Sequence, residues 1–173
     1  MKCSLIGPSD AEALTMYFDG LSDETKNRFG PHPFDIDTVA AICNHAYRNY
    51  QAFVCTDDAT IAAYTVVAKG YIEADRKRYE GYDFYIDDRH DCTLAPSVAD
   101  AYQSKGLGSK LYVFVEEALR KQGVRKIVLW GGVQLLNDRA VRFYQKHRFR
   151  TLGQFHHDGM ENLDMVKEIG DPV

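Results

Sequence analysis

The residues with the clearest chemical meaning form a short segment, Gln103-Ser104-Lys105-Gly106-Leu107-Gly108-Ser109. It follows a strand-like run, Cys92 to Val98, and precedes a long amphipathic stretch that predicts a helix. The first peptide N–H groups of a helix have no partner inside it and lie at the positive end of its dipole. Two glycines leave room for a ligand beside the backbone. The segment therefore predicts an anion site suited to a phosphate or pyrophosphate, with Lys105 and Lys110 adding positive charge.

Two common phosphate-binding motifs do not fit this segment. A P-loop needs a glycine five residues before Gly-Lys-Ser/Thr, and the chain has no such run. The dinucleotide fingerprint needs a third glycine three residues after the second, where this chain has Leu111. What remains is Gln-x-x-Gly-x-Gly, a pattern that an ordinary turn between a strand and a helix can also carry. The segment alone therefore leaves both interpretations open.

The sequence that follows the segment predicts three further elements. One face of the expected helix is apolar and comprises Leu107, Leu111, Val115, Ala118 and Leu119. Gly123 ends this helix. Lys126 to Trp130 then predicts a buried strand, which Gly131-Gly132 breaks. A second helix is expected from Asn137, a good N-cap, to His147.

A second motif lies on this last helix, Asn137-x-x-Ala140-x-x-Phe143-Tyr144-x-x-x-x-Phe149. With the Gln-x-x-Gly-x-Gly segment before it, the region from about Cys92 to Lys167 resembles the GCN5-related N-acetyltransferases. The resemblance is loose before that region. The family usually has glycine before the phenylalanine, where this chain has Arg148, and we expect this difference to change a turn rather than the chemistry.

The resemblance implies a mixed α/β fold with a mostly antiparallel sheet flanked by helices. The sheet of that family is splayed open, here between the strand ending at Val98 and the strand ending at Trp130. The implied reaction is acyl transfer from the thioester of acetyl-CoA to an amine, by direct attack in a ternary complex. The thioester oxygen gains negative charge in the transition state, and a backbone N–H at the end of the Val98 strand would stabilise it.

The resemblance also implies which residues hold acetyl-CoA. The backbone of the loop would bind the pyrophosphate, through Gln103, Ser104, Lys105, Gly106, Leu107, Gly108 and Ser109. The strand edge near Val98 would pair with the amide groups of pantetheine. Asn137 matches a further CoA contact of the family.

Tyr144 is the expected proton donor to the leaving CoA thiolate, because it occupies the tyrosine position of the motif, seven residues after Asn137. The same tyrosine could be a core residue, and both roles are compatible if its hydroxyl reaches the sulfur. The base that deprotonates the amine stays open, because the strand from Cys92 to Val98 has no carboxylate. The candidates are water, Asp91, His90, Glu80, Asp83 and Asp87.

Residues 69–91 are rich in tyrosines and carboxylates. The simpler interpretation is a solvated connection, because charge runs usually face solvent. The alternative is an acidic, aromatic wall of the acceptor pocket that attracts a protonated amine, with the Phe29–Phe34 loop as the opposite wall. The residues concerned are Tyr71, Tyr79, Tyr82, Tyr85, Glu73, Asp75, Glu80, Asp83, Asp87, Asp88 and Asp91.

The composition is that of one globular domain over residues 1–173, with 45% hydrophobic and 27% charged residues. The net charge of −4 argues against a nucleic-acid partner, because phosphate backbones recruit basic surfaces. No signal-peptide pattern and no long apolar run is present, so we expect a cytoplasmic protein without a membrane partner. Four scattered cysteines, Cys3, Cys43, Cys55 and Cys92, predict free thiols in a reducing compartment. The histidines and cysteines lack zinc-ligand spacing, so we expect no metal.

The first part of the chain predicts short alternating elements. They are a strand at Leu5-Ile6, a helix from a capping box at Ser9 to Gly20, a helix from Ser22 to Phe29, a helix capped by Asp37, and a hairpin of Ala52–Cys55 with Ile61–Ala68. At the other end, Asp164 to Lys167 predicts an edge or closing strand.

These patterns together predict an acetyl-CoA-dependent N-acetyltransferase whose acceptor is a small-molecule amine. A protein N-terminus or lysine side chain stays open as the acceptor, and so does a homodimer. The rival is a noncatalytic acyl-CoA-binding regulatory module on the same fold. The missing strand carboxylate favours the rival, whereas Tyr144 favours the enzyme.

Overall fold

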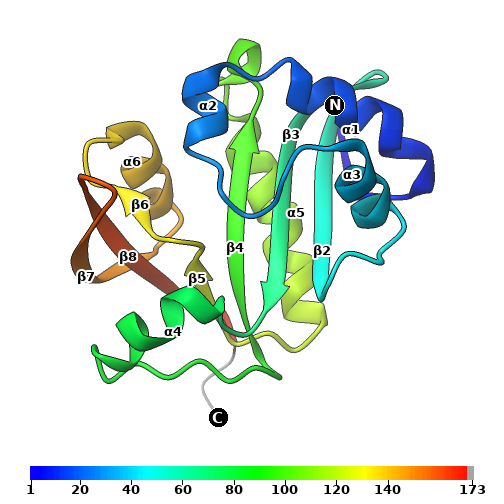
Figure 1. Ribbon diagram of the computed structural model, residues 1–173. Helices are drawn as coiled ribbons and strands as arrows, with labels where there is room; N and C mark the ends of the chain where they lie inside the picture. The colour runs from blue at the N-terminus through cyan, green and yellow to red at the C-terminus, as the bar shows by residue number, and fades with distance from the viewer. Residues whose placement is uncertain (171–173) are drawn as a thin grey trace. The chain divides into compact units, whose positions relative to one another are not determined.

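The computed structural model describes residues 1–170, which fall into two compact units. Unit 1 comprises Met1–Val67 and Ala95–Ala118, and unit 2 comprises Ala68–Leu94 and the chain from Leu119 onward. Both units combine helices with strands, as Figure 1 shows. The expectation of one domain over residues 1–173 stays a prediction.

Unit 1 contains neighbouring strands in the order β1, β2, β3 and β4, the last two of which continue into unit 2. Their bounds are Lys2–Leu5 for β1, Tyr50–Asp57 for β2, Thr60–Lys69 for β3 and Asp91–Val98 for β4. The expected hairpin is confirmed: β2 and β3 are joined by a turn in which Asp58 has φ 50°. β3 is buried from Ile61 to Ala68, as its apolar sequence requires.

Unit 1 contains α1, α2, α3 and most of α5, which continues into unit 2, and Figure 1 shows α3 in front of its strands and α5 behind them. Their bounds are Ala11–Asp19 for α1, Asp23–Asn27 for α2, Ile36–Cys43 for α3 and Leu107–Lys121 for α5. The apolar face expected for α5 is confirmed, because Leu107, Leu111, Val115 and Leu119 are at most 3% exposed.

Two of the expected helix caps are wrong. Pro8–Asp10 forms a 3-10 turn in which Asp10 Oδ2 accepts a hydrogen bond from Gly7 N, so α1 begins at Ala11 without a capping box at Ser9. Asp35, and not Asp37, caps α3, because its extended backbone lets Oδ1 accept from Thr38 N at 2.9 Å. The expected cap at Ser22 is confirmed, since its Oγ accepts from Thr25 N at 3.2 Å.

The expectation of four free thiols is wrong for Cys3 and Cys55, which form a disulfide. The two residues lie opposite each other on the antiparallel strands β1 and β2. They are 52 residues apart in sequence, so nothing in their spacing indicated the pairing. Cys43 and Cys92 are free and buried. Burial raises the pKa of the Cys43 thiol to about 11.

Unit 2 is organised around one central strand. β8 (Met160–Glu168) pairs antiparallel with β5 (Lys126–Leu129), β6 (Val133–Gln134) and β7 (Arg150–His157). Of the two alternatives expected for Asp164–Lys167, an edge or a closing strand, the edge strand is therefore wrong. The helices are α4 (Glu73–Glu80) and α6 (Asp138–Lys146). The mixed α/β class, with mostly antiparallel strands flanked by helices, is confirmed.

The parallel pairing of β4 with β5 is short. It covers Asp91–Leu94 and Lys126–Leu129, and Trp130 N then donates to Leu94 O at 3.1 Å. Pro96, further along β4, has no N–H with which to extend a ladder. Gly131 and Gly132, directly after Trp130, have φ 64° and 70° and turn the backbone away from a strand.

Among residues 1–170, no helix has the length and apolar character needed to cross a membrane.

Candidate active site

The expected anion-binding loop lies between β4 and α5 in unit 1. A 3-10 turn, Asp100–Tyr102, follows β4, and Gln103 has an extended backbone. Ser104 and Gly106 have φ 60° and 80°. A side chain at Gly106 would meet no atom within 4 Å, so glycine is favoured there by its backbone conformation. Helix α5 begins directly afterwards at Leu107 and directs the positive end of its dipole toward the loop.

Gln103 ties this loop to the end of β4. Its Nε2 donates to Val98 O at 3.1 Å, and it also lies 3.3 Å from Thr25 Oγ1 and 3.4 Å from Asp100 Oδ1. The Gln103 side chain therefore holds the loop in place, and its role toward a phosphate would be indirect.

Asp100 is a residue of this loop region that the sequence did not single out. Its Oδ1 accepts from Ser22 Oγ and from Thr25 Oγ1, each at 2.8 Å, and its Oδ2 accepts from Ser22 N at 2.9 Å. These hydrogen bonds, led by the one from the Ser22 backbone, lower the pKa of Asp100. The only sequence signal for this contact was the polar start of α2 at Ser22, which lies 78 residues before Asp100 in the chain.

The two lysines near the loop have different surroundings. The Lys105 ammonium lies 5.9 Å from the centre of the Tyr102 ring, and its side chain is exposed. Lys110 Nζ donates to Met1 O at 2.7 Å. Both supply positive charge at the start of α5, as expected from the sequence.

Asn137 and Tyr144 lie on α6 in unit 2. Asn137 is the N-cap, as expected, with Oδ1 accepting from Ala140 N at 3.3 Å. The Tyr144 ring is 7% exposed and packs edge-on against Phe143 and Phe149, with ring centres 5.2 and 5.3 Å away. Arg148 has φ 65°, the left-handed conformation that glycine favours, so a residue with a side chain is strained at this turn.

The environment of Tyr144 keeps its hydroxyl protonated. Burial raises the pKa of Tyr144 well above its usual value of 10. Its hydroxyl makes no hydrogen bond with any residue in the described range 1–170. Its ring packs against Phe143 and Phe149 in unit 2. The residue is thus both a core tyrosine and an available proton donor.

Three of the candidate bases cluster at the start of β4. Asp87 Oδ2 lies 2.7 Å from His90 Nδ1 and 2.7 Å from Arg125 Nη2, and the hydrogen bond from His90 leads in lowering the pKa of Asp87 to about 2. Asp91 is buried, with Oδ2 3.6 Å from Lys126 Nζ. The carboxylates of this cluster are engaged in ion pairs.

The segment of residues 69–91 is built into unit 2. Five of its seven carboxylates lie within 4 Å of a basic side chain: Glu73, Asp75, Asp87, Asp88 and Asp91. Three of its four tyrosines donate hydrogen bonds inward: Tyr71 to Phe84 O, Tyr79 to Leu129 O and Tyr82 to Asp164 Oδ2. This arrangement supports a connection over an acidic wall, but the expected solvation is wrong for Asp75, Tyr79 and Asp91, which are buried.

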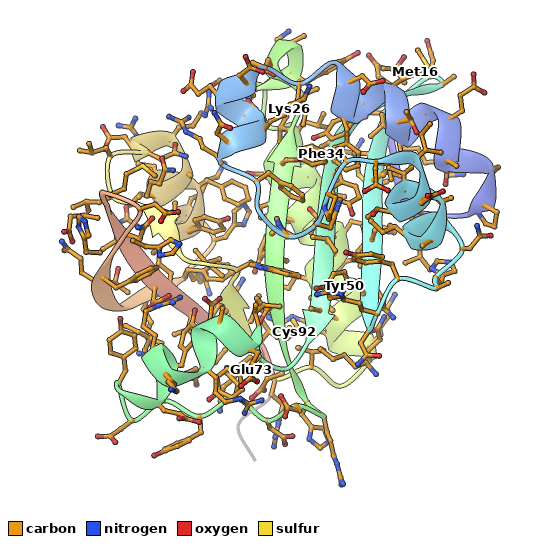
Figure 2. The ribbon with its side chains drawn as sticks, viewed as in Figure 1. Met16, Lys26, Phe34, Tyr50, Glu73 and Cys92 are labelled. Atoms are coloured by element: carbon orange, nitrogen blue, oxygen red, sulfur yellow. A yellow bond between two sulfur atoms is a disulfide. The ribbon has the colours of Figure 1, made fainter. Side chains whose placement is uncertain are left out.

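The Phe29–Phe34 loop belongs to an aromatic cluster of unit 1. His32 is 6% exposed, with Nδ1 2.8 Å from Pro33 O and Nε2 2.9 Å from Tyr64 OH. A carbonyl oxygen only accepts, so Nδ1 carries the proton and Nε2 accepts from Tyr64. Burial lowers the pKa of His32. Phe18 stacks on Phe34, which Figure 2 shows on the segment that crosses in front of β3 and β4.

Within residues 1–170, no group of three or more His, Cys, Asp or Glu side chains is placed to hold a metal ion.

Comparisons with known proteins place this geometry in context. The family model described as "Acetyltransferase (GNAT) family" matches residues 15–149. The structure of yncA from Salmonella typhimurium, with its cofactor acetyl-CoA, is 17% identical, with a TM-score of 0.75 over 100% of this chain and 96% of that chain. The acetyltransferase of GNAT family from Streptococcus pneumoniae is 22% identical, with a TM-score of 0.73 over 98% of this chain and 99% of that chain.

A third solved structure is similar in fold. The ribosomal-protein-S18-alanine N-acetyltransferase from Escherichia coli is 21% identical, with a TM-score of 0.64 over 99% of this chain and 96% of that chain. A comparison with curated proteins found no match. At these identities the solved structures show the shared fold, and the family rests on the match to its model.

Proposed function

Because the chain belongs to the acetyltransferase (GNAT) family, whose model matches residues 15–149, we propose that it transfers an acetyl group from acetyl-CoA to an amine. The observation that carries this proposal is the loop from Gln103 to Ser109, held by Gln103 at the start of α5. A helix start preceded by a glycine in left-handed conformation suits the pyrophosphate of CoA. The yncA structure, which contains acetyl-CoA, supports the same cosubstrate.

The rest of acetyl-CoA is assigned from the family motif. Pantetheine pairs with the edge of β4 near Val98. Asn137 contacts CoA through its side-chain Nδ2 donor, since its Oδ1 already caps α6. The thioester oxygen needs a donor as it becomes negative. Trp130 N donates to Leu94 O, whereas Ala99 N donates to Ala62 O on β3, so the backbone groups of even-numbered residues of this part of β4 face away from β3. Pro96 has no N–H, so the donor there is Val98 N.

Tyr144 donates a proton to the CoA thiolate as it leaves. Its hydroxyl can take this role because burial keeps it protonated and no other residue in the range 1–170 engages it. The acceptor amine must lose a proton before attack. The ion pairs of Asp87 and Asp91 favour water over these residues as the first proton acceptor.

We propose a small-molecule amine as the acceptor, on the acidic net charge of −4. A protein acceptor is the second candidate, and structures of similar fold include the ribosomal-protein-S18-alanine N-acetyltransferase from Escherichia coli. A panel of small amines, peptides with free N-termini and lysine-containing peptides, each offered with acetyl-CoA and analysed by mass spectrometry, separates the two. Acetylation confined to the peptides would overturn the small-molecule proposal.

The noncatalytic rival makes a different prediction for the same panel. A regulatory module binds acetyl-CoA and transfers nothing to any amine.

The cytoplasmic location expected from the sequence stays a proposal, and the Cys3–Cys55 disulfide opposes it, since disulfides are rare in reducing compartments. A homodimer stays open, and light scattering of the purified protein tests it.

A further inference from the structure

A buried ion network in unit 2 surrounds Arg78 of α4. Its Nε donates to Asp164 Oδ2 at 2.5 Å and its Nη2 donates to Asp164 Oδ1 at 2.9 Å, which makes a two-pronged contact. Nη2 also donates to Asp75 Oδ1 at 3.0 Å. The side chains of Asp164 and Asp75 are 0% and 8% exposed. The network thus holds two buried carboxylates and one guanidinium.

Neighbouring aromatic groups fix the Asp164 side of this network. Tyr82 OH donates to Asp164 Oδ2 at 3.0 Å. The guanidinium carbon of Arg78 lies 3.7 Å from the centre of the Phe155 ring on β7. Asp164 lies on β8, the central strand. Asp164 is therefore a complete partner for the Arg78 charge, without a second carboxylate.

Asp75 makes one further contact, and it reaches the turn after β5. Its Oδ2 accepts a hydrogen bond from the backbone N–H of Gly131 at 2.9 Å. On the other side of this turn, a side chain at Gly132 would come within 2.7 Å of Leu163 O and 2.8 Å of the Phe155 ring. Asp75 therefore holds the turn from Trp130 to Gly132 through a hydrogen bond. On the other side of the turn, β7 and β8 leave no room for a side chain at Gly132.

Stability alone does not explain the second carboxylate. Burying a charge costs free energy, and a buried ion pair often contributes little more than a well-packed apolar group. Asp75 adds a negative charge to an Arg78–Asp164 pair that is already balanced. What Asp75 supplies, and Asp164 does not, is an acceptor for Gly131 N.

The turn from Trp130 to Gly132 lies at the carboxyl end of the parallel pairing of β4 with β5. Trp130 N makes the last bond of the parallel pairing, to Leu94 O, and Gly131 is the next residue. Ligands of α/β sheets bind outside the carboxyl ends of parallel strands. Under the proposed function, the acetyl group reacts at this end of the pairing. Acyl transfer requires reacting atoms about 3–3.5 Å apart, and a misplacement of about 1 Å can lower the rate about a hundredfold.

We propose that Asp75 is a positioning residue for acetyl transfer, which fixes the carboxyl end of β5 by holding Gly131 N–H. This inference rests on the proposed function. Arg78 and Asp164 orient the Asp75 carboxylate, and Asp75 itself contacts neither cosubstrate. The segment of residues 69–91 thereby serves the active site by supporting the turn after β5 rather than by lining an acceptor pocket.

Asp75→Asn and Asp75→Ala test the proposal, because the Arg78–Asp164 pair keeps its charge balance in both. Glu73→Gln is the matched control: Glu73 lies on the same helix, as Figure 2 shows, and its ion pair with Arg76 is exposed. Amide hydrogen exchange at Gly131 reports the hydrogen bond. Emission of Trp130, the only tryptophan of the chain, reports the turn. Calorimetry gives the Kd for acetyl-CoA, and steady-state kinetics give kcat.

We expect Asp75→Ala to fold, to exchange the Gly131 amide at least about tenfold faster, and to shift Trp130 emission. Asp75→Asn keeps one acceptor oxygen for either Gly131 N or Arg78, so its exchange rate should lie between those of wild type and Asp75→Ala. We expect kcat to fall about 10- to 100-fold while the Kd for acetyl-CoA changes less than about twofold. The control should match wild type in every readout. Unchanged Gly131 exchange, or a faster exchange with wild-type kcat, would overturn the proposal. Wild-type protein that acetylates no amine would instead refute the proposed function, and the positioning role would fall with it.

Discussion

The Nε2 atom of Gln103 donates a hydrogen bond to the carbonyl oxygen of Val98 at 3.1 Å. This bond ties the loop proposed to bind pyrophosphate to the strand residue proposed to pair with pantetheine. A loop held in its binding conformation loses less conformational entropy when a ligand binds. The two features of unit 1 that are proposed to bind CoA are therefore linked by a hydrogen bond, and we expect changes in the loop to weaken binding more than folding.

Gly108→Val should weaken acetyl-CoA binding severely while the domain still folds. A branched side chain in the first turn of α5 crowds the place proposed for the phosphates. Titration calorimetry measures the effect. Gly7→Val is the matched control, because Gly7 has φ −138° and its nearest neighbour to an added Cβ is 3.9 Å away. Wild-type affinity in Gly108→Val would remove the loop from the binding site.

Tyr144→Phe should lower kcat by on the order of a hundredfold, with the Kd for acetyl-CoA nearly unchanged. The change keeps the ring that packs against Phe143 and Phe149 and removes only the hydroxyl. Tyr85→Phe is the control, because Tyr85 is 64% exposed and should leave kcat at the wild-type value. If Tyr144→Phe turns over like wild type where chemistry limits the rate, another group protonates the thiolate.

Reduction of the Cys3–Cys55 disulfide should lower stability without unfolding unit 1 at room temperature. Closing a loop of 52 residues contributes about 4 kcal/mol in the chain-entropy account, or a Tm decrease on the order of 10 °C on reduction. Thiol counting in denaturant checks the bond itself. Two reactive thiols, Cys43 and Cys92, are expected before reduction and four after it. Four thiols in protein that was never reduced would contradict the disulfide.

His32 should make stability fall as the pH drops below about 6.5, its unfolded pKa. Burial lowers the pKa of His32 in the folded state, so below pH 6.5 the unfolded chain binds a proton that the folded protein does not. The loss ends where pH falls below the folded pKa. Denaturant titrations at several pH values, on wild type and His32→Gln, isolate this contribution. An identical pH dependence in the two proteins would show that His32 does not contribute.

Local sequence signals predicted the elements that local physics determines. The hairpin of β2 and β3, the apolar face of α5, the glycines after β5 and the cap at Asn137 each depend on residues close in the chain. The cap at Asp35 was missed because Asp35 and Asp37 can both cap, and backbone geometry selects one. The start of α1 was misplaced because the Asp10 side chain bonds Gly7 N instead of the helix.

Contacts between remote residues could not be predicted in this way. The facing positions of Cys3 and Cys55 depend on the register of β1 with β2. The central place of β8 depends on which strands pair with it, including β6, a strand of two residues. The bond from Gly131 N to Asp75 joins positions 56 residues apart. Tyr79 and Tyr82, considered from the sequence as residues of an acceptor pocket, instead donate hydrogen bonds to Leu129 O and Asp164 Oδ2, which are remote in the chain.

The most direct test of acetyl transfer is a single turnover with acetyl-CoA that carries a heavy-isotope acetyl group, with enzyme in excess over cosubstrate. Mass spectrometry then follows the label on the amine and on the protein. Direct attack in a ternary complex predicts label on the amine, one CoA released per acetyl group, and no labelled protein at any time. Label that remains on acetyl-CoA despite tight binding would contradict the account and identify a noncatalytic module.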